Sequence, residues 1–224
     1  MRVGRQTVPM PLPDRHLDLG CGDAPRNPYG RAQLCGIDIR APDGNVGHEH
    51  RTANLVVGPI PCPDDSFGSV SAFDFIEHVP RIFPDGQGGT CFPFIELMNE
   101  IWRVLAHDGR MSALTSAFPH TDAFVDPTHV NIITDDSHAY FCGPRPDARM
   151  YGFHGHFEIV RVVRTERGAA YSALPGSPEN HAPRKLAARA LRRWLRWIRG
   201  RAHTPRAPYL LWQLRAVKQA PRQA

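Results

Sequence analysis

A ten-residue stretch near the start of the chain, His16 to Pro25, reads HLDLGCGDAP and constrains the fold more than any other segment. Leu17 and Leu19 give its first half the apolar character of a buried strand, which Asp18 interrupts with a charge. The glycines that follow let the backbone turn tightly, with no bulky side chain between the amides and a ligand. A buried parallel strand that ends in a glycine turn is a frequent site for a nucleotide-like ligand.

The same turn also begins the dinucleotide-binding pattern G-x-G-x-x-G, so the residue at the third glycine position matters. That glycine lets a helix pack closely on the strand beside a pyrophosphate, and here Pro25 takes its place. Proline cannot play this part, which argues against a dinucleotide site. Because Pro25 and Pro28 also disfavour a regular helix, we expect the first crossover helix to be short or replaced by a loop.

Strand and crossover patterns alternate up to residue 116, which predicts a parallel α/β sheet. The expected strands lie at about 15–20, 34–39, 53–57, 70–73, 110–116, 157–165 and 209–217. Between the fourth and fifth strands, apolar residues three and four apart predict an amphipathic helix that begins near Pro93. We expect this helix to end at His107-Asp108-Gly109, with Gly109 as its left-handed cap.

Charge is distributed unevenly along the 224 residues. Beyond Glu179, the last acidic residue, lie 12 of the 27 Lys and Arg residues, which leaves 15 bases against 22 acids before it. The net charge is therefore −7 up to Glu179 and +12 after it, for a total of +5. Binding of anionic partners should accordingly involve the tail rather than the main body.

Length and composition suit one globular domain with an appendage. We expect an extended lead-in at 1–13, a main domain at 14–170 plus 207–219, and an inserted basic helical region at 171–206. No apolar run is long enough for a bilayer span or a secretory signal. The five cysteines form no C-x-x-C pair and are expected to be reduced thiols in a cytoplasmic protein.

Several motifs in the first half of the chain resemble those of class I S-adenosylmethionine-dependent methyltransferases of the small-molecule type. The segment HLDLGCG resembles the family's L-D-L-G-C-G signature. Other segments follow in the family's order: ANL at 53–55, PCPDDSFGSV at 61–70, EHV at 77–79, and NEIWRVL at 99–105 with Gly109. The resemblance covers roughly residues 15–116. It implies a Rossmann-like, mostly parallel seven-stranded sheet with helices on both faces. A shortened first crossover helix and a basic amphipathic helix inserted before the last strand complete the expected fold.

The resemblance also implies S-adenosyl-L-methionine as the cofactor, at the ends of the first, second and fourth strands. Asp38 ends the strand beside the glycine turn, where a carboxylate can hold both ribose hydroxyls; the alternative is a cap or turn aspartate. Asp18 could attract the cofactor's ammonium group or order the loop, the alternative being a solvated acid at a strand end. The candidate cofactor-binding residues are Asp18, Gly20, Cys21, Gly22, Asp38, Ile39, Asn54, Leu55, Phe73 and Asp74.

Two residues depart from the family's pattern. Asn54 stands where aspartate is common, although its amide oxygen can still meet the adenine amine. Gly68 replaces a frequent aspartate after Phe67, which predicts the loss of a structural contact. Either change could weaken the affinity for the cofactor.

Loops at the carboxyl ends of strands carry the reacting groups in this architecture. His129 is a candidate base for an acceptor hydroxyl, with Asp126 to orient it. The alternative is a structural histidine bonded to a backbone carbonyl. His78, after the fourth strand, is the second candidate, set against a capping or packing role. No predicted helix carries an i, i+4 histidine pair with an acid, so we expect no metal site.

Residues 184–201 read RKLAARALRRWLRWIRGR, and helical spacing separates their apolar and basic side chains onto opposite faces. Trp194 and Trp197 beside arginines suit the interface of an anionic membrane. A helix packed on the sheet with a solvated basic face explains the pattern equally well. Nucleic acid is a weaker partner, because no aromatic residues are interleaved with the basic face.

The expected function is therefore transfer of a methyl group to a small-molecule or glycan-like hydroxyl, amine or carboxylate. The expected location is the cytoplasm, or the inner membrane surface if residues 184–201 bind lipid. The alternative is a catalytically inactive protein of the same fold, which its basic helix tethers to an anionic membrane or a partner.

Overall fold

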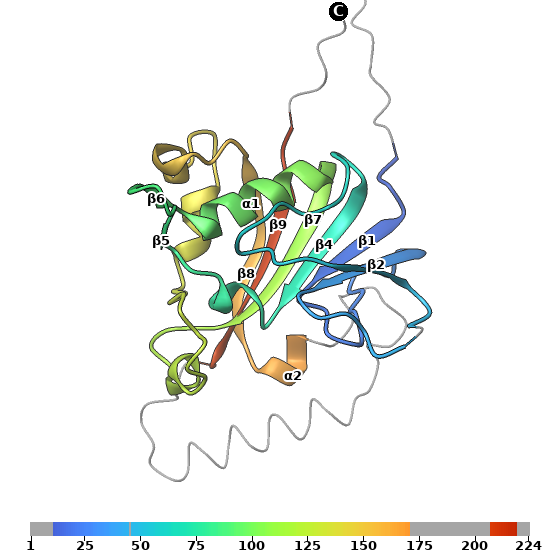
Figure 1. Ribbon diagram of the computed structural model, residues 1–224, viewed down its shortest axis with the longest axis horizontal. Coiled ribbons are helices and arrows are strands. Elements are labelled where there is room, and N and C mark those ends of the chain that lie inside the picture. The colour runs from blue at the N-terminus through green and yellow to red at the C-terminus, as the bar shows by residue number, and fades with distance from the viewer. Residues whose placement is uncertain (1–10, 45, 171–206, 219–224) are drawn as a thin grey trace, which may run out of the picture.

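The computed structural model describes residues 11–44, 46–170 and 207–218, which contain a seven-stranded sheet in the order β3-β2-β1-β4-β7-β9-β8 (Figure 1). Neighbouring strands are parallel except at β9, which runs antiparallel to both β7 and β8. The strands of this sheet are β1 (Arg15–Leu19), β2 (Gln33–Asp38), β3 (Glu49–Thr52), β4 (Phe67–Phe73), β7 (Leu105–Ser116), β8 (Phe157–Thr165) and β9 (Tyr209–Ala216). A separate hairpin joins β5 (Phe83–Pro84) and β6 (Thr90–Cys91).

The described helices are two α-helices and four short 3₁₀ helices. They are α1 (Pro93–Val104), α2 (Arg167–Ala170), η1 (Ile76–His78), η2 (Thr121–Phe124), η3 (Ser137–Phe141) and η4 (Asp147–Tyr151). None of them is long and apolar enough to cross a membrane. The predicted basic helix at 184–201 and most of the lead-in lie outside the described residues.

The mostly parallel seven-stranded sheet confirms the expected fold class, and β8 and β9 lie where the sequence places them. The strand expected at 53–57 is wrong, because the third strand is β3, four residues earlier, and 53–57 is a turn. Asn54 explains the turn: its Oδ1 accepts a hydrogen bond from Val56 N at 3.1 Å, and its carbonyl accepts one from Val57 N at 3.3 Å. An Asn side chain that bonds the backbone two residues ahead competes with strand pairing.

The helix α1 covers one face of the sheet, in front of it in Figure 1. Its spacing of apolar residues buries Met98, Ile101 and Val104 completely against the strands. A fully buried side chain of this kind contributes about 1.5–3 kcal/mol. The predicted cap at Gly109 is wrong, since α1 ends at Val104 and β7 begins with the next residue.

The first crossover, between β1 and β2, contains no helix, as Pro25 and Pro28 predict. Its loop covers the other face of the sheet: the Tyr29 hydroxyl donates to the carbonyl of Met111 at 3.4 Å, and the Arg26 guanidinium lies over the ring of Phe73. The expectation of helices on both faces is therefore only partly met, because α1 is the one long helix among the described residues.

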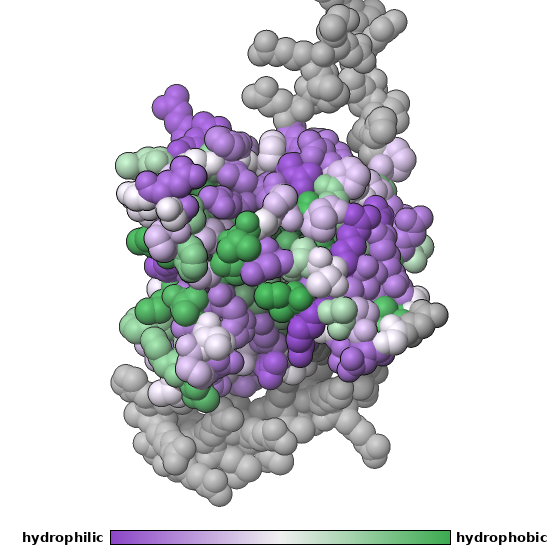
Figure 2. Space-filling view, in the orientation of Figure 1, coloured by the Kyte–Doolittle hydropathy of each residue, from purple (hydrophilic) through white to green (hydrophobic). Residues whose placement is uncertain are grey.

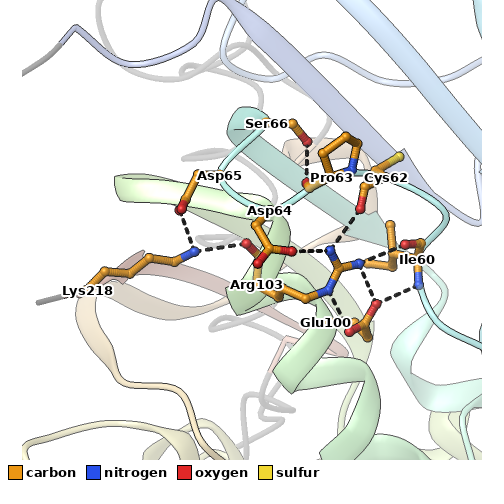
Figure 3. Close-up of polar contacts among 9 residues, drawn as sticks. All are labelled: Ile60, Cys62, Pro63, Asp64, Asp65, Ser66, Glu100, Arg103 and Lys218. Atoms are coloured by element: carbon orange, nitrogen blue, oxygen red, sulfur yellow. Dashed lines mark hydrogen bonds and ion pairs between the residues drawn. The ribbon is translucent and has the colours of Figure 1, made fainter. Parts of the chain in front are cut away.

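Arg103, in the last turn of α1, holds the loop that precedes β4 (Figure 3). Its guanidinium donates to the carbonyls of Ile60 and Cys62, each at 2.8 Å, and to Asp64 at 2.6 Å. Glu100, one turn earlier, fixes the guanidinium and also accepts from Ile60 N at 2.8 Å. Arg103 thus joins the segment at 61–70 to the segment at 99–105.

Gly68 departs from the family's pattern for a steric reason. A Cβ at this position would lie 2.1 Å from the carbonyl oxygen of Pro13 and 3.1 Å from the Arg31 guanidinium carbon. The lead-in therefore crosses β4 directly above Gly68, and a side chain there would force the two segments apart. The absence of a side chain at Gly68 leaves room for this crossing.

Candidate functional site

The glycine turn after β1 lies against the end of β2, as the sequence predicts. Asp38, the last residue of β2, accepts a hydrogen bond from Gly22 N at 2.9 Å through Oδ2. Gly20 and Gly22 both have positive φ angles, of 64° and 55°, which other residues rarely adopt. No atom lies within 4 Å of the point where a Cβ of Gly22 would be, so this side of the turn is open.

The amides of the turn are already bonded. Gly20 N and Cys21 N both donate to the carbonyl of Ile37, at 2.8 and 3.1 Å. A ligand would therefore meet the open side of Gly22 and the carboxylate of Asp38 rather than free amide donors. Burial opposes ionisation of Asp38, yet hydrogen bonds from Arg40 N and Gly22 N prevail and lower its pKa. The carboxylate is thus kept charged, as an acceptor for ribose hydroxyls requires.

The side chain of Cys21 points into the core rather than toward the open side of the turn. It is 4% exposed, and a Cβ on Gly36 of β2 would lie 2.6 Å from its Sγ. Gly36 thus makes room for the thiol beneath the turn. Burial, followed by the charges of Asp18 and Asp38, raises the pKa of Cys21 to about 12. Only the backbone of Cys21 remains as a candidate for contact with a cofactor.

Asp18 is fully buried and holds the loop after the turn. Its Oδ2 accepts from Arg26 N at 2.8 Å, and its Oδ1 accepts from the Ser71 hydroxyl at 2.5 Å. Ser71 in turn lies 2.7 Å from Nε2 of His16, whose Nδ1 is 2.8 Å from Ser69 Oγ. Burial raises the pKa of Asp18 to about 6 and lowers that of His16 to about 3. Of the two roles expected for Asp18, this geometry supports ordering of the loop.

The remaining candidates for cofactor contact differ in exposure. Ile39 is 62% exposed just beyond Asp38, whereas Leu55 and Phe73 are buried. Asn54 uses its side-chain oxygen for its own turn. Asp74 follows β4 in the left-handed region, with φ of 54°, and its Oδ2 pairs with Arg167 at 2.8 Å. A strained non-glycine backbone at a strand end is frequent at functional sites.

The two candidate catalytic histidines lie together. His78 belongs to η1 and His129 to the loop after β7, and their ring centroids are 4.7 Å apart at an angle of 71°. Nδ1 of His129 lies 3.3 Å from the carbonyl of Ala123, which is the contact expected of a structural loop histidine. Asp126 lies on the other side of the ring, with Oδ2 4.0 Å from Nε2. This distance is too long for the hydrogen bond by which Asp126 was expected to orient His129.

Sequence analysis missed three neighbours of these histidines. Thr128 links His78 to Asp126, since its Oγ1 lies 2.9 Å from Nδ1 of His78 and 2.6 Å from Oδ1 of Asp126. Ser116 Oγ lies 3.3 Å from Nδ1 of His129. Glu77 is 1% exposed, its Oε1 accepts from Ser116 N at 3.3 Å, and burial raises its pKa. The sequence marks Glu77 only as part of the EHV motif at 77–79, and not as a site residue.

A cleft of about 450 Å³ lies beside the β5–β6 hairpin. Phe92, Tyr140 and Tyr151 line it, and the two tyrosine rings stack with centroids 6.3 Å apart. Arg81 also lines the cleft, and its Nε donates to Asn131 Oδ1 at 2.6 Å, which connects the cleft to the loop that carries His129. Figure 2 shows the molecule in the orientation of Figure 1. On this face apolar residues interrupt the polar surface, several of them toward the left-hand edge.

The sheet order, the single antiparallel strand and the glycine turn beside an acid at the end of β2 define the fold of class I S-adenosylmethionine-dependent methyltransferases. A similar solved chain comes from the complex between the Haloferax volcanii Trm112 methyltransferase activator and a protein described as a methyltransferase. It is 14% identical, with 93% of this chain and 86% of that chain covered and a TM-score of 0.54. The [4+2]-cyclase SpnF is 16% identical, with 92% and 76% covered and a TM-score of 0.50.

An S-adenosylmethionine-dependent methyltransferase from Mesorhizobium loti is also 16% identical, with 90% of each chain covered and a TM-score of 0.49. No protein-family profile matches the sequence, and no curated protein matches it. The likeness to the two neighbours with TM-scores of 0.54 and 0.50 shows the fold alone.

Proposed function

We propose that this protein transfers a methyl group from S-adenosylmethionine to a small-molecule or glycan-like acceptor. The contact between Asp38 and Gly22 carries the proposal, because it joins the open glycine turn to a charged acid at the end of the neighbouring strand. A ribose with two adjacent hydroxyls fits an acid in this position. The buried bonds of Asp18 keep the loop after the turn in place around such a ligand.

The cofactor supplies a methyl group that its sulfonium charge has already activated, so the protein has mainly to align the acceptor and exclude water. An acceptor oxygen or nitrogen forms the new bond to the methyl carbon as the S–C bond breaks, and the electron pair of that bond stays on sulfur. An acceptor hydroxyl also has to lose its proton. His129 is the candidate base, because the carbonyl of Ala123 fixes a proton on Nδ1 and leaves the Nε2 lone pair available.

The cleft beside the β5–β6 hairpin supports an acceptor of small-molecule size. Aromatic rings such as those of Tyr140 and Tyr151 stack on flat or sugar rings, and Arg81 and Asp136 add polar contacts. The volume of about 450 Å³ lies in the range of pockets that enclose small ligands, roughly 300–1,000 Å³.

Calorimetry with S-adenosylmethionine and with its demethylated product tests the proposal directly. We expect saturable binding of both by the wild type and weaker binding by Asp38→Ala. A labelled-methyl screen of cell extract would then identify the acceptor. If neither compound binds the wild type, the enzyme proposal fails.

The alternative function, a non-catalytic protein of this fold, has one observation in its favour. SpnF is named as a [4+2]-cyclase, so this fold is not restricted to proteins named for methyl transfer. In this alternative, residues 184–201 hold the protein at an anionic membrane or on a partner. Sedimentation with anionic liposomes tests the membrane role, which Trp194→Ala with Trp197→Ala should abolish.

A further inference from the structure

Three side chains with metal-binding atoms meet beyond the ends of β4 and β7. His78 comes from η1, after β4, while Asp126 and His129 come from the loop after β7. One ligand atom from each lies within 4.8 Å of those of the other two. The backbone fixes this meeting, since Val130 N and Asn131 N both donate to the carbonyl of Glu77, at 3.0 and 2.9 Å.

The hydrogen bonds of His129 leave one ring nitrogen free to bind a cation. The carbonyl of Ala123 can only accept, so it fixes a proton on Nδ1, which lies 3.3 Å away. Nε2 then keeps its lone pair, and this is the nitrogen that lies 4.0 Å from Oδ2 of Asp126. Metal-binding histidines typically donate their other ring N–H to a carbonyl or carboxylate in this way.

Thr128 gives His78 the same arrangement. Its hydroxyl donates to Oδ1 of Asp126 at 2.6 Å, so its oxygen accepts from Nδ1 of His78 at 2.9 Å. The proton of His78 is thereby placed on Nδ1, and Nε2 is left with a lone pair. Thr128 N also donates to Oδ1 of Asp126, at 2.8 Å, which leaves Oδ2 as the oxygen toward His129.

Glu77 supplies an independent observation. It is 1% exposed, directly precedes His78, and reaches His129 through Ser116. Its Oε2 has no hydrogen-bond partner among the described residues. An unpartnered oxygen of a buried carboxyl group is costly, and a cation close by would reduce that cost.

We propose that His78, Asp126 and His129 bind one divalent transition-metal ion. Two neutral imidazoles and one carboxylate suit Zn²⁺, Co²⁺ or Fe²⁺ better than Mg²⁺ or Ca²⁺, which prefer oxygen ligands. Bonds of about 2.0–2.2 Å place neighbouring ligand atoms roughly 3–3.5 Å apart, so side chains whose ligand atoms are now up to 4.8 Å apart have to close by about 1–2 Å. Three protein ligands leave at least one coordination position open.

The open coordination position allows the ion to bind the acceptor. This role rests on the proposed methyl transfer. When the ion is bound, Nε2 of His129 is its ligand, so the ion takes over the activation of the hydroxyl for which His129 is otherwise the candidate base. A hydroxyl oxygen bound to the metal loses its proton to water more readily, because the cation stabilises the alkoxide or phenoxide. The oxygen lone pair then forms the bond to the methyl carbon, and the S–C electron pair stays on sulfur. The site thus favours a hydroxyl acceptor over an amine.

Titration of the untagged, chelator-treated full chain with Co²⁺ tests the site, because the visible absorption of bound Co²⁺ reports its coordination. We expect saturation at one ion per chain and displacement by Zn²⁺. His129→Ala, His78→Ala and Asp126→Asn should each weaken binding by about tenfold or more, as loss of a ligand or its charge requires. His154→Ala removes an exposed histidine outside the cluster and serves as the matched control, with unchanged affinity.

Binding that is absent in the wild type, or that survives all three substitutions, overturns the metal site. Thermal unfolding of each variant shows whether the fold is retained, and Asp126→Asn, on an exposed carboxyl, is the variant least able to disturb it. Calorimetry with S-adenosylmethionine is run separately on the metal-free chain. Failure of that titration removes the proposed function, whereas failure of the Co²⁺ titration alone removes only the metal.

Discussion

The carboxylate of Asp38 accepts the amide proton of Gly22 across 2.9 Å, so that one contact joins the end of β2 to the turn after β1. Two segments that are 16 residues apart in the chain thereby form one ligand-facing corner. The carboxylate has a second oxygen, which accepts from Arg40 N at 3.0 Å. Both oxygens have a structural task in addition to any contact with a cofactor.

Asp38→Ala should weaken S-adenosylmethionine binding about 10- to 100-fold, since hydrogen bonds to a charged group contribute about 1.5–3 kcal/mol. Calorimetry measures the change. Asp43→Ala, on an exposed loop after the same strand, is the control and should bind like the wild type. Equal affinities for Asp38→Ala and Asp43→Ala would show that Asp38 has no part in cofactor binding.

Gly68→Ala should destabilise the fold by about 1–3 kcal/mol, because its Cβ would collide with the carbonyl of Pro13 at 2.1 Å. Urea denaturation measures the free energy of unfolding. Gly58→Ala is the matched control, since its Cβ would make only an ordinary contact at 3.5 Å with the carbonyl of Asn54. Similar losses in the two variants would contradict the steric account of Gly68.

Arg103→Lys should cost about 1.5–3 kcal/mol of unfolding free energy, because an ammonium group cannot reach both the carbonyls of the loop and the carboxylate of Glu100. The loop at 60–66 should also become more sensitive to proteolysis. Arg145→Lys, at an exposed position, is the control. A variant as stable and as protease-resistant as Arg145→Lys would show that the contacts in Figure 3 contribute little.

The buried pair of His16 and Asp18 predicts a specific pH dependence. Folding raises the pKa of Asp18 from 3.8 to about 6, so within that window its contribution to stability falls as the pH rises. Folding lowers the pKa of His16 from 6.5 to about 3, so its contribution rises with pH over that range. The two slopes oppose each other between pH 3.8 and about 6.

Asp18→Asn should therefore leave only the pH dependence of stability that His16 causes. Relative to the wild type, the variant should lose about 1.4 kcal/mol of stability for each pH unit of acidification in this window. Urea denaturation at several pH values gives the two curves, with Asp43→Asn as a control that should follow the wild type. Parallel curves for Asp18→Asn and the wild type would contradict the assignment.

The parts that sequence analysis predicted well are those with local signals. The glycine turn, the end of β2 at Asp38 and the loop imposed by Pro25 each depend on a few adjacent residues. The position of β3 could not be predicted from the sequence, because its residues, Glu49–Thr52, are polar. Their strand conformation depends on pairing with β2 at the sheet edge. The end of α1 was misplaced because Gly109 lies within β7, five residues beyond the last helical residue.

The sequence names His78, Asp126 and His129 as candidate site residues, but it does not predict that all three meet. His78 lies in the short helix η1, whereas Asp126 and His129 lie about 50 residues later, in the loop after β7. Backbone bonds between the Glu77 carbonyl and the loop at 130–131 bring them together. A search for ligands at fixed spacing cannot detect residues that only tertiary structure makes neighbours.

The ring of Phe75 lies against the glycine turn, where a Cβ on Gly20 would approach it to 2.6 Å. Phe75 also directly precedes η1, which carries His78. A ligand that moves the turn therefore has to move or strain the start of η1. In the same way, a ligand that moves His78 has to move or strain the turn. Binding at the glycine turn and binding at His78 should therefore be energetically coupled. Demethylated S-adenosylmethionine should change the affinity for the acceptor by a certain factor, and the acceptor should change the affinity for this product by the same factor.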